Sequence, residues 1–237
     1  MKTLGIIGGM GPMATVDLMR KIILSTDAKS DQEHIHMLVD CNTKVPDRTA
    51  AIEGGGESPV KEMLKSAKLL EEQGADVIVI ACNTAHYFLD EFKDKVNVPI
   101  INMVDEAVKH CVELGYSEVG LLCTIGTRNT GLYQKACDRF NLKLIVPDDE
   151  EIKAIQDMIY SGVKANNFNY DTSNVKSVIS NMRNRGAQAF ILGCTETPIA
   201  VHMYHLEGNF IDSSQVLAHK AIEAVGAPLI KNSRTKL

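Results

Sequence analysis

Short apolar runs alternate with amphipathic stretches along the chain. The apolar runs lack polar alternation, which is typical of parallel strands that are covered on both faces. They lie at residues 4–7, 35–39, 77–80, 119–122 and 190–192. Amphipathic patterns at residues 60–73, 152–163 and 213–225 predict helices. The chain is therefore expected to have an α/β fold.

A repeat divides this pattern into two similar halves. Gly74-Ala75 leads through an apolar run to Cys82, and Gly186-Ala187 leads in the same way to Cys194. Self-similarity at a fixed offset predicts two similar α/β lobes, each with a mainly parallel sheet flanked by helices and related by a pseudo-two-fold repeat. We expect residues 1–103 and 212–237 in the first lobe, residues 104–211 in the second, and the active site in the cleft between the lobes.

Charge and length exclude several classes of protein. The 25 basic and 30 acidic side chains give a formal charge of −5, which argues against a nucleic-acid partner. A chain of 237 residues can bury a large core without disulfides. No secretory leader and no apolar run long enough to cross a bilayer are evident, so we expect a reducing, cytoplasmic location and no membrane partner. The six cysteines should then be free thiols.

Two of these cysteines stand where a predicted strand ends. Cys82-Asn83-Thr84 follows one apolar run, and Cys194-Thr195 follows another. Ligands of open α/β sheets bind at the carboxyl ends of the strands. A helix that begins there would lower the thiol pKa, and the Asn and Thr side chains could hold a carboxylate. The alternative is that both are core residues, as we expect of the other four cysteines, which should pack or line the walls.

A glycine motif after the first run leaves another interpretation open. Gly9 to Ala14 matches G-x-G-x-x-A, the pattern that brings a backbone close to a dinucleotide pyrophosphate. The expected acid is not well placed, because Asp40 lies beyond the usual spacing of about 20 residues. Tight turns from strand to helix also need glycine whatever they bind. No metal site is expected, because the histidine pairs lack the spacing of zinc ligands.

Two basic residues extend the repeat. Arg48 follows Asp47 in a loop segment, and Lys164 occupies the corresponding place in the second half. Arg48 could form a bidentate fork with a carboxylate, and Lys164 could act as a point charge. Together they would recognise an anionic group of a small ligand. The alternative is a pair of solvated surface cations.

Paired thiols without a metal or cofactor motif suit a two-base proton transfer. One thiolate removes the α-proton from one face of a carbon while the opposite thiol protonates the other face, which inverts the configuration. Donors aimed at the α-carboxylate must stabilise the carbanion that forms between these steps. A non-catalytic two-lobed protein that binds a small dicarboxylate or a nucleotide remains the alternative.

Four segments carry a family resemblance, which covers essentially the whole chain. They are residues 5–12 (GIIGGMGP), 46–49 (PDRT), 81–86 (ACNTAH) and 193–196 (GCTE). In these segments the chain resembles the aspartate/glutamate racemase family, and most of all its cofactor-independent aspartate racemases. Glutamate racemases have a histidine after the second Cys-Thr, where this chain has Glu196. The resemblance implies a homodimeric isomerase that interconverts L- and D-aspartate, with glutamate as a weaker substrate and no cofactor.

The resemblance also assigns roles to residues of this chain. It implies that Cys82 and Cys194 are the paired acid/base thiols, with Asp47 and Glu196 close to them as supporting acid/base groups. The two cations described above would receive the side-chain carboxylate of the substrate. The expected substrate-binding residues are Met10, Arg48, Asn83, Thr84, Thr124, Lys164 and Thr195.

Overall fold

The computed structural model describes residues 1–230, so the expectation for residues 231–237, as part of the first lobe, falls outside the described residues. The described chain divides into two compact units. The first unit holds Met1–Glu106 and the chain from Ser214 onward, and the second holds Ala107–Ser213. Within residues 1–230, every helix is too short or too polar to span a membrane.

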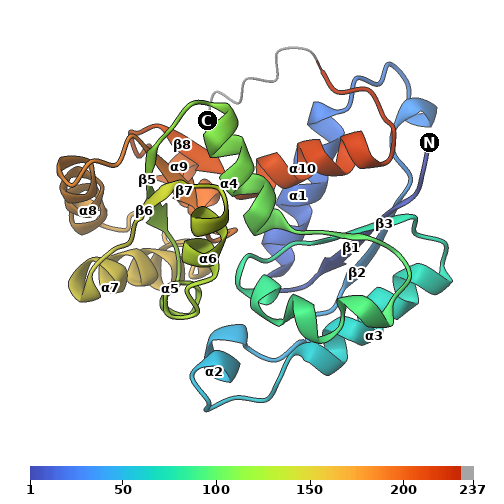
Figure 1. Cartoon of the computed structure of the whole chain (residues 1–237), viewed down its shortest axis with the longest axis horizontal. Helices are drawn as coiled ribbons and strands as arrows, with labels where there is room; N and C mark the ends of the chain where they lie inside the picture. The colour runs from blue at the N-terminus through green and yellow to red at the C-terminus, as the bar shows by residue number, and fades with distance from the viewer. Residues whose placement is uncertain (231–237) are drawn as a thin grey trace. The chain divides into compact units, whose positions relative to one another are not determined.

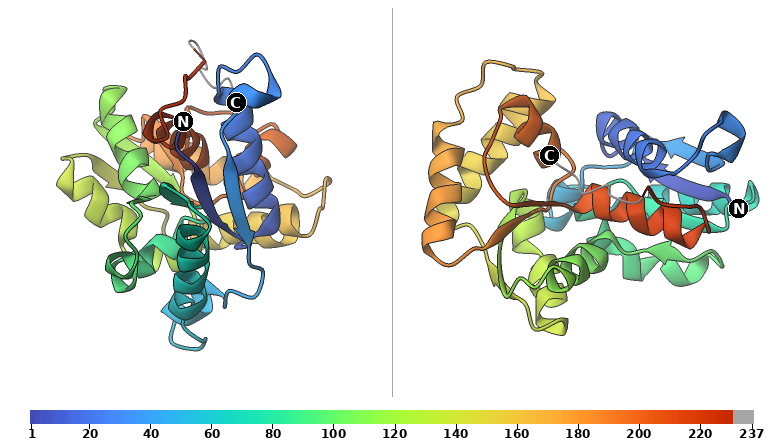
Figure 2. Two further views of the ribbon diagram at one scale, coloured as in Figure 1. Left: turned by 90° about the vertical axis from the view of Figure 1, so that its right-hand side faces the viewer. Right: turned by 90° about the horizontal axis from the view of Figure 1, so that it is seen from above.

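The first unit is built on a four-stranded parallel sheet in the order β2-β1-β3-β4. Helices α1 (Pro12–Ser25) and α10 (Ser213–Ala224) pack together on one face of this sheet (Figures 1 and 2). Helix α3 (Val60–Glu72) and the 3₁₀ segment η2 (Thr84–Glu91) pack on the other face. The strands are β1 (Leu4–Gly8), β2 (Met37–Cys41), β3 (Val77–Ile80) and β4 (Ile100–Ile101). The short segments are η1 (Asp31–Glu33), α2 (Arg48–Ile52) and η3 (Lys93–Lys95).

The second unit repeats this plan with a parallel sheet in the order β6-β5-β7-β8. Helices α7 and α8 lie to one side of its strands, and α4 and α6 lie to the other (Figure 1). The strands are β5 (Glu118–Leu122), β6 (Lys143–Ile145), β7 (Ala189–Leu192) and β8 (Phe210–Asp212). The helices are α4 (Met103–Glu113), whose first turn belongs to the first unit, α5 (Ile125–Asn129), α6 (Leu132–Arg139), α7 (Asp149–Asp157), the π-helical segment η4 (Met158–Lys164), α8 (Ser173–Asn184) and α9 (Thr197–Met203).

The predicted α/β fold is confirmed, and both sheets share one strand order. The central strands β1 and β3 are buried along their whole length, which explains why their sequences show no polar alternation. The helix predicted at residues 152–163 begins earlier, because Asp148 and Glu151 form a capping box that starts α7 at Asp149. Its later part is the π-helical segment η4.

Parallel pairing brings the candidate residues of each unit to one edge of its sheet. In the first sheet Ile7 pairs with Ile80, so the loop after β1 and the turn after β3 leave the sheet at the same edge. In the second sheet Leu122 pairs with Leu192, so Thr124 and Cys194, each two residues further on, lie at the same edge of that sheet. The carboxyl edge of each sheet therefore carries one of the two cysteines.

Candidate active site

The first cysteine turn, residues 82–84, is buried at the end of β3. Cys82 is 6% exposed and packs in one apolar cluster with Met10 and Val45. Asn83 and Thr84 are also buried, and both have polar partners. The turn continues into the 3₁₀ segment η2 rather than into the α-helix that the sequence suggested. The structure therefore brings three predicted site residues together at the edge of the first sheet.

The loop after β1 is shaped by close packing against β2. Gly9 has a φ of +86°, and a Cβ at this position would lie 2.3 Å from the carbonyl carbon of Asn42, so only glycine fits. The Gly9 amide donates to Thr15 Oγ1 at 2.9 Å, and Pro12 opens α1. Packing of the chain against itself thus accounts for the first glycine of the G-x-G pattern that had suggested a dinucleotide.

Arg48 joins this loop to the start of α2. Its Nη2 donates to the carbonyl of Met10 at 3.1 Å, and its Nη1 donates to the carbonyl of Pro46 at 3.0 Å. Its Nε is buried and has no hydrogen-bond partner in the described part of the chain. The predicted fork towards a carboxylate would therefore require Arg48 to exchange backbone partners. Asp47 is the N-cap of α2, where its Oδ1 accepts from the Ala50 amide.

In the second cysteine turn, residues 194–196, a thiol is hydrogen-bonded to a carboxylate. The Cys194 Sγ donates to Glu196 Oε2 at 3.0 Å, and Thr195 Oγ1 donates to the same oxygen at 3.2 Å. All three residues are buried. The hydroxyl of Thr197, in the first turn of α9, donates to the Cys194 carbonyl at 2.6 Å. The expected proximity of Glu196 to a thiol is thus present within this turn.

Burial raises the pKa of the Cys194 thiol well above its ordinary value, and the Glu196 carboxylate raises it further. The Glu196 backbone amide and the Lys164 ammonium lower this pKa, but they do so more weakly. The expectation that a helix start makes this thiol acidic is therefore wrong for Cys194. The helix begins three residues later, and the sulfur is hydrogen-bonded to a carboxylate.

Lys164 is the last residue of the π-helical segment η4, and its positive charge lowers the pKa of the Cys194 thiol. Its Nζ lies 4.2 Å from the ring centroid of Tyr160, one turn earlier, in a cation–π contact. Single π-helical turns occur frequently at functional sites. Tyr160 was not among the predicted site residues, although side chains four positions apart are neighbours on a helix.

Thr124 has a capping role at the start of α5. Its Oγ1 accepts from the Thr127 amide at 3.2 Å and lies 3.1 Å from the Thr127 hydroxyl. Both residues are buried. Thr124 shares the carboxyl edge of the second sheet with Cys194, as the strand register requires.

The remaining cysteines divide into a buried and an exposed group. Cys111, Cys123 and Cys137 are buried, and burial raises the pKa of each thiol to about 12. They behave as small core residues, as predicted. Cys41 is exposed, so the expectation that it packs is wrong. It ends β2, an edge strand that pairs only with β1 among the described strands.

Glu196→Gln should lower the pKa of the Cys194 thiol, because the substitution removes the neighbouring negative charge. The check is the pH dependence of Cys194 alkylation by iodoacetamide, followed by mass spectrometry of the Cys194 peptide. The midpoint should move to lower pH, since the thiolate is the reacting form. Glu207→Gln, at an exposed position in the same unit, should leave the midpoint unchanged. Equal midpoints in both variants would contradict the assignment of this shift to Glu196.

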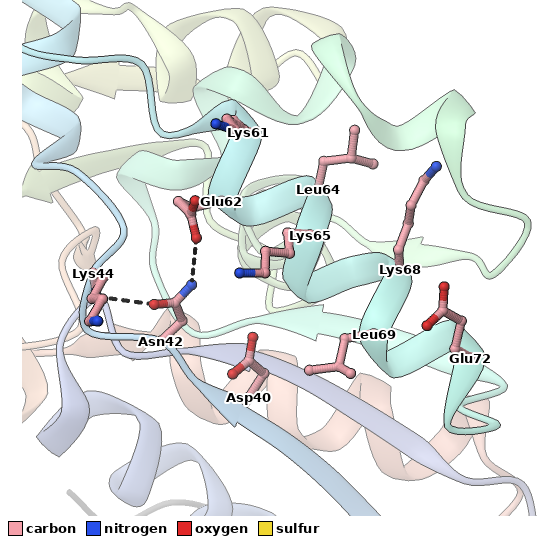
Figure 3. Close-up of a pocket in the computed structure, with 10 residues that line it drawn as sticks. All are labelled: Asp40, Asn42, Lys44, Lys61, Glu62, Leu64, Lys65, Lys68, Leu69 and Glu72. Atoms are coloured by element: carbon pink, nitrogen blue, oxygen red, sulfur yellow. Dashed lines mark hydrogen bonds between the residues drawn. The ribbon is translucent and has the colours of Figure 1, made fainter.

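A groove of about 690 Å³ lies in the first unit, between α3 and the end of β2, and no residue of either cysteine turn lines it (Figure 3). Asn42 spans it by accepting from the Lys44 amide at 3.0 Å and donating to Glu62 at 3.3 Å. Its charges are mixed, and none of the predicted site residues lines it. The lining residues are Asp40, Asn42, Lys44, Lys61, Glu62, Leu64, Lys65, Lys68, Leu69 and Glu72.

Comparison with known proteins identifies the family. A family model described as Asp/Glu/Hydantoin racemase matches residues 7–221. The chain belongs to this racemase family. Its membership favours catalysis over the binding-protein and nucleotide alternatives, and the two cysteine turns are the candidate active-site elements of this racemase.

Relatives with assigned names support the same class of activity. The chain is 27% identical over 225 residues to a broad specificity amino-acid racemase of Bacillus subtilis (strain 168), covering 92% of this chain and 96% of that protein. Its structure is similar to that of an aspartate racemase of Picrophilus torridus, with a TM-score of 0.84, 34% identity and coverage of 97% and 96%. An aspartate racemase homologue of Pyrococcus horikoshii OT3 gives a TM-score of 0.77 at 27% identity, with coverage of 95% and 99%.

Proposed function

We propose that this racemase interconverts L- and D-aspartate, without a cofactor, by proton transfer through Cys82 and Cys194. The observation that carries the proposal is the equivalent place of the two cysteines. Each lies two residues after the strand that stands third in its sheet, and the two sheets have the same strand order. One thiol from each unit would serve opposite faces of one α-carbon.

The second cysteine turn has the groups that a thiol acid needs. The raised pKa keeps Cys194 protonated at neutral pH, so it starts the cycle as the proton donor. In the reverse direction Cys194 must act as a base, and Glu196 Oε2 is in place to accept the Sγ proton at 3.0 Å. The proposal therefore gives Glu196 the role of supporting acid/base. The family resemblance is the ground on which Asp47 is proposed for the same role towards Cys82.

Two kinds of group would bind the substrate. The buried amide and hydroxyl groups of Asn83 and Thr84, with their neighbouring backbone amides, are proposed to hold the α-carboxylate and to stabilise the charge of the carbanion. Lys164 and Arg48 are proposed to bind the side-chain carboxylate. The choice of aspartate is supported by these cations and by the similarity to the Picrophilus torridus enzyme. Glutamate, one methylene longer, would be a weaker substrate.

The test is proton NMR of L-aspartate in D₂O with the purified chain and without pyridoxal phosphate. The Cα proton signal should disappear as deuterium enters, and D-aspartate should accumulate to equality on chiral chromatography. A Cys82→Ala/Cys194→Ala double variant, purified in parallel, reports any racemase carried over from the host. Faster exchange of glutamate than of aspartate would reverse the substrate assignment. Exchange equal to that of the double variant, with both amino acids, would refute the proposal.

Two further expectations belong to this proposal. The resemblance to aspartate racemases implies a homodimer, which sedimentation equilibrium can test. An enzyme that uses two thiols as acid and base is inactivated by their oxidation, so a reducing cytoplasm suits its chemistry. Activity that is lost on mild oxidation and restored by a thiol reductant would agree with this location.

A further inference from the structure

One buried histidine is hydrogen-bonded to the first cysteine turn. His86 is 4% exposed and comes four residues after Cys82. Its Nδ1 lies 2.9 Å from the Cys82 carbonyl oxygen, and its Nε2 accepts a hydrogen bond of 3.2 Å from the Met103 amide. Met103 is the first residue of α4, the helix through which the chain leaves the first unit. The ring thus connects the cysteine turn to the start of this helix.

These two contacts fix the protonation state of the ring. The Met103 amide can only donate, so Nε2 must be unprotonated. The Cys82 carbonyl can only accept, so Nδ1 must carry the proton. A doubly protonated ring would lose the Met103 contact and place a charge in the core. The geometry therefore requires neutral His86 in its Nδ1–H tautomer.

The surroundings agree with a neutral ring. Burial lowers the pKa of His86 below its ordinary value. The backbone groups around the ring and the Asp105 carboxylate, which comes from the first turn of α4, raise this pKa but only in part offset the effect of burial. His86 therefore holds its tautomer as a fixed donor and acceptor and does not supply a proton.

The second unit holds its cysteine in an equivalent way. There the Thr197 hydroxyl, three residues after Cys194, donates to the Cys194 carbonyl at 2.6 Å. In both turns a buried side chain from the following segment donates a hydrogen bond to the carbonyl oxygen of the cysteine itself. This oxygen is two bonds from the Cα of the cysteine, so the contact restrains the direction of the Cα–Cβ bond.

We infer that His86 is a positioning residue for the Cys82 thiol, acting through the Cys82 carbonyl and anchored on the amide of Met103. This inference rests on the proposed role of Cys82 in proton transfer. A thiol that delivers a proton to one face of a carbon must hold its sulfur within a fraction of an ångström of the productive place. Loss of the anchor should therefore affect the proton-transfer step more than substrate binding.

The tautomer can be tested on the unaltered protein. Long-range ¹H–¹⁵N correlation spectra of the ¹⁵N-labelled chain, assigned with a His86→Asn sample, distinguish protonated from unprotonated ring nitrogens. Nδ1 should be protonated and Nε2 unprotonated between about pH 8 and about pH 6, where exposed histidines titrate. An Nε2–H tautomer, or a ring that gains a second proton in this range, would overturn the inference.

The positioning role can be tested with His86→Ala and His86→Asn. Asparagine places an amide donor near the position of Nδ1, so it can restore the Cys82 contact that alanine removes. For His86→Ala we expect kcat to fall by about 10-fold to 100-fold with KM for aspartate nearly unchanged, as misplacement of a reacting group predicts. His86→Asn should recover most of this loss. His110→Asn, in the last turn of α4, is the matched control and should behave as the parent protein.

A second readout separates this inference from the proposed function. The rate of iodoacetamide alkylation of Cys82 is divided by that of Cys194 in the same sample, using peptide mass spectrometry. His86→Ala should raise this ratio by about threefold or more, because the loosened turn exposes Cys82 and leaves the second unit unchanged. A raised ratio without any racemase activity would refute the proposed function and keep the positioning role. An unchanged ratio, or an unchanged kcat in an active enzyme, would overturn the positioning role.

Discussion

Replacing Cys82 with alanine should lower the rate of aspartate racemisation in both directions by about 10²-fold to 10⁴-fold, and Cys194→Ala should do the same. Each direction of a two-base reaction uses one thiol as base and the other as acid, so neither variant can complete an inversion. The measurement is the initial rate from each enantiomer by chiral chromatography. Both rates should fall together, because the two directions share the same pair of groups.

Isotope exchange should distinguish the two variants. A chain with one remaining thiol can still remove the α-proton from one face and return a deuteron to that face. Each variant should therefore exchange only one enantiomer with D₂O, without inversion, and the two variants should exchange opposite enantiomers. Exchange of the same enantiomer by both variants, or full racemisation by either, would contradict the assignment of one thiol to each face.

Cys41→Ala provides the matched control for these experiments. Cys41 is exposed and ends the edge strand β2, so its loss should change neither the racemisation rate nor the melting temperature. The active-site variants should also keep the parent circular dichroism spectrum. Replacing Cys82 or Cys194 with alanine removes one buried sulfur atom. Each replacement should lower the free energy of unfolding by about 1–2 kcal/mol.

The long apolar strands were predictable because burial on both faces leaves a clear pattern. Residues 77–80 form β3 with the predicted bounds, and the helix predicted at 213–225 corresponds to α10. The strands β4, β6 and β8 were not predicted. Strands of two or three residues are too short to show a period, and their pairing is set by the neighbouring strand of the sheet.

The candidate site was predictable where its chemistry follows from one turn of chain. Cys194 and Glu196 are two residues apart, and their contact is local. The contacts of Arg48 with Met10 and of His86 with Met103 were not predictable, because each joins residues that only the folded sheet brings together. The pKa direction at Cys194 was also missed. A sequence shows that a helix starts nearby, but it does not show the degree of burial that outweighs this effect.

The two cysteine turns offer different environments to equivalent thiols. The Cys194 thiol has a carboxylate as hydrogen-bond partner within its own turn, whereas Cys82 is followed by the uncharged residues Asn83 and Thr84. A racemase needs both thiols to alternate between acid and base, but it does not need them to do so with the same helper group. This difference predicts that Glu196→Gln alters the pH profiles of the two directions unequally.

Lys164→Met should raise KM for aspartate by about 30-fold or more, equivalent to the loss of about 2 kcal/mol or more from a desolvated charge pair. Methionine keeps much of the length of lysine and its contact with the Tyr160 ring while removing the charge. The same substitution should raise the pKa of Cys194 further, because the Lys164 ammonium lowers it in the parent protein. Initial-rate kinetics and the pH dependence of Cys194 alkylation measure these two effects.

The matched control is Lys176→Met, at an exposed position on α8 in the same unit, which should leave both measurements unchanged. Lys164→Arg tests whether charge alone is sufficient. Arginine keeps the positive charge and can still stack on Tyr160, so it should recover part of the affinity for aspartate. An unchanged KM in Lys164→Met would show that Lys164 does not bind the side-chain carboxylate. A higher alkylation midpoint in that same variant would then limit the role of Lys164 to the electrostatics of the Cys194 thiol.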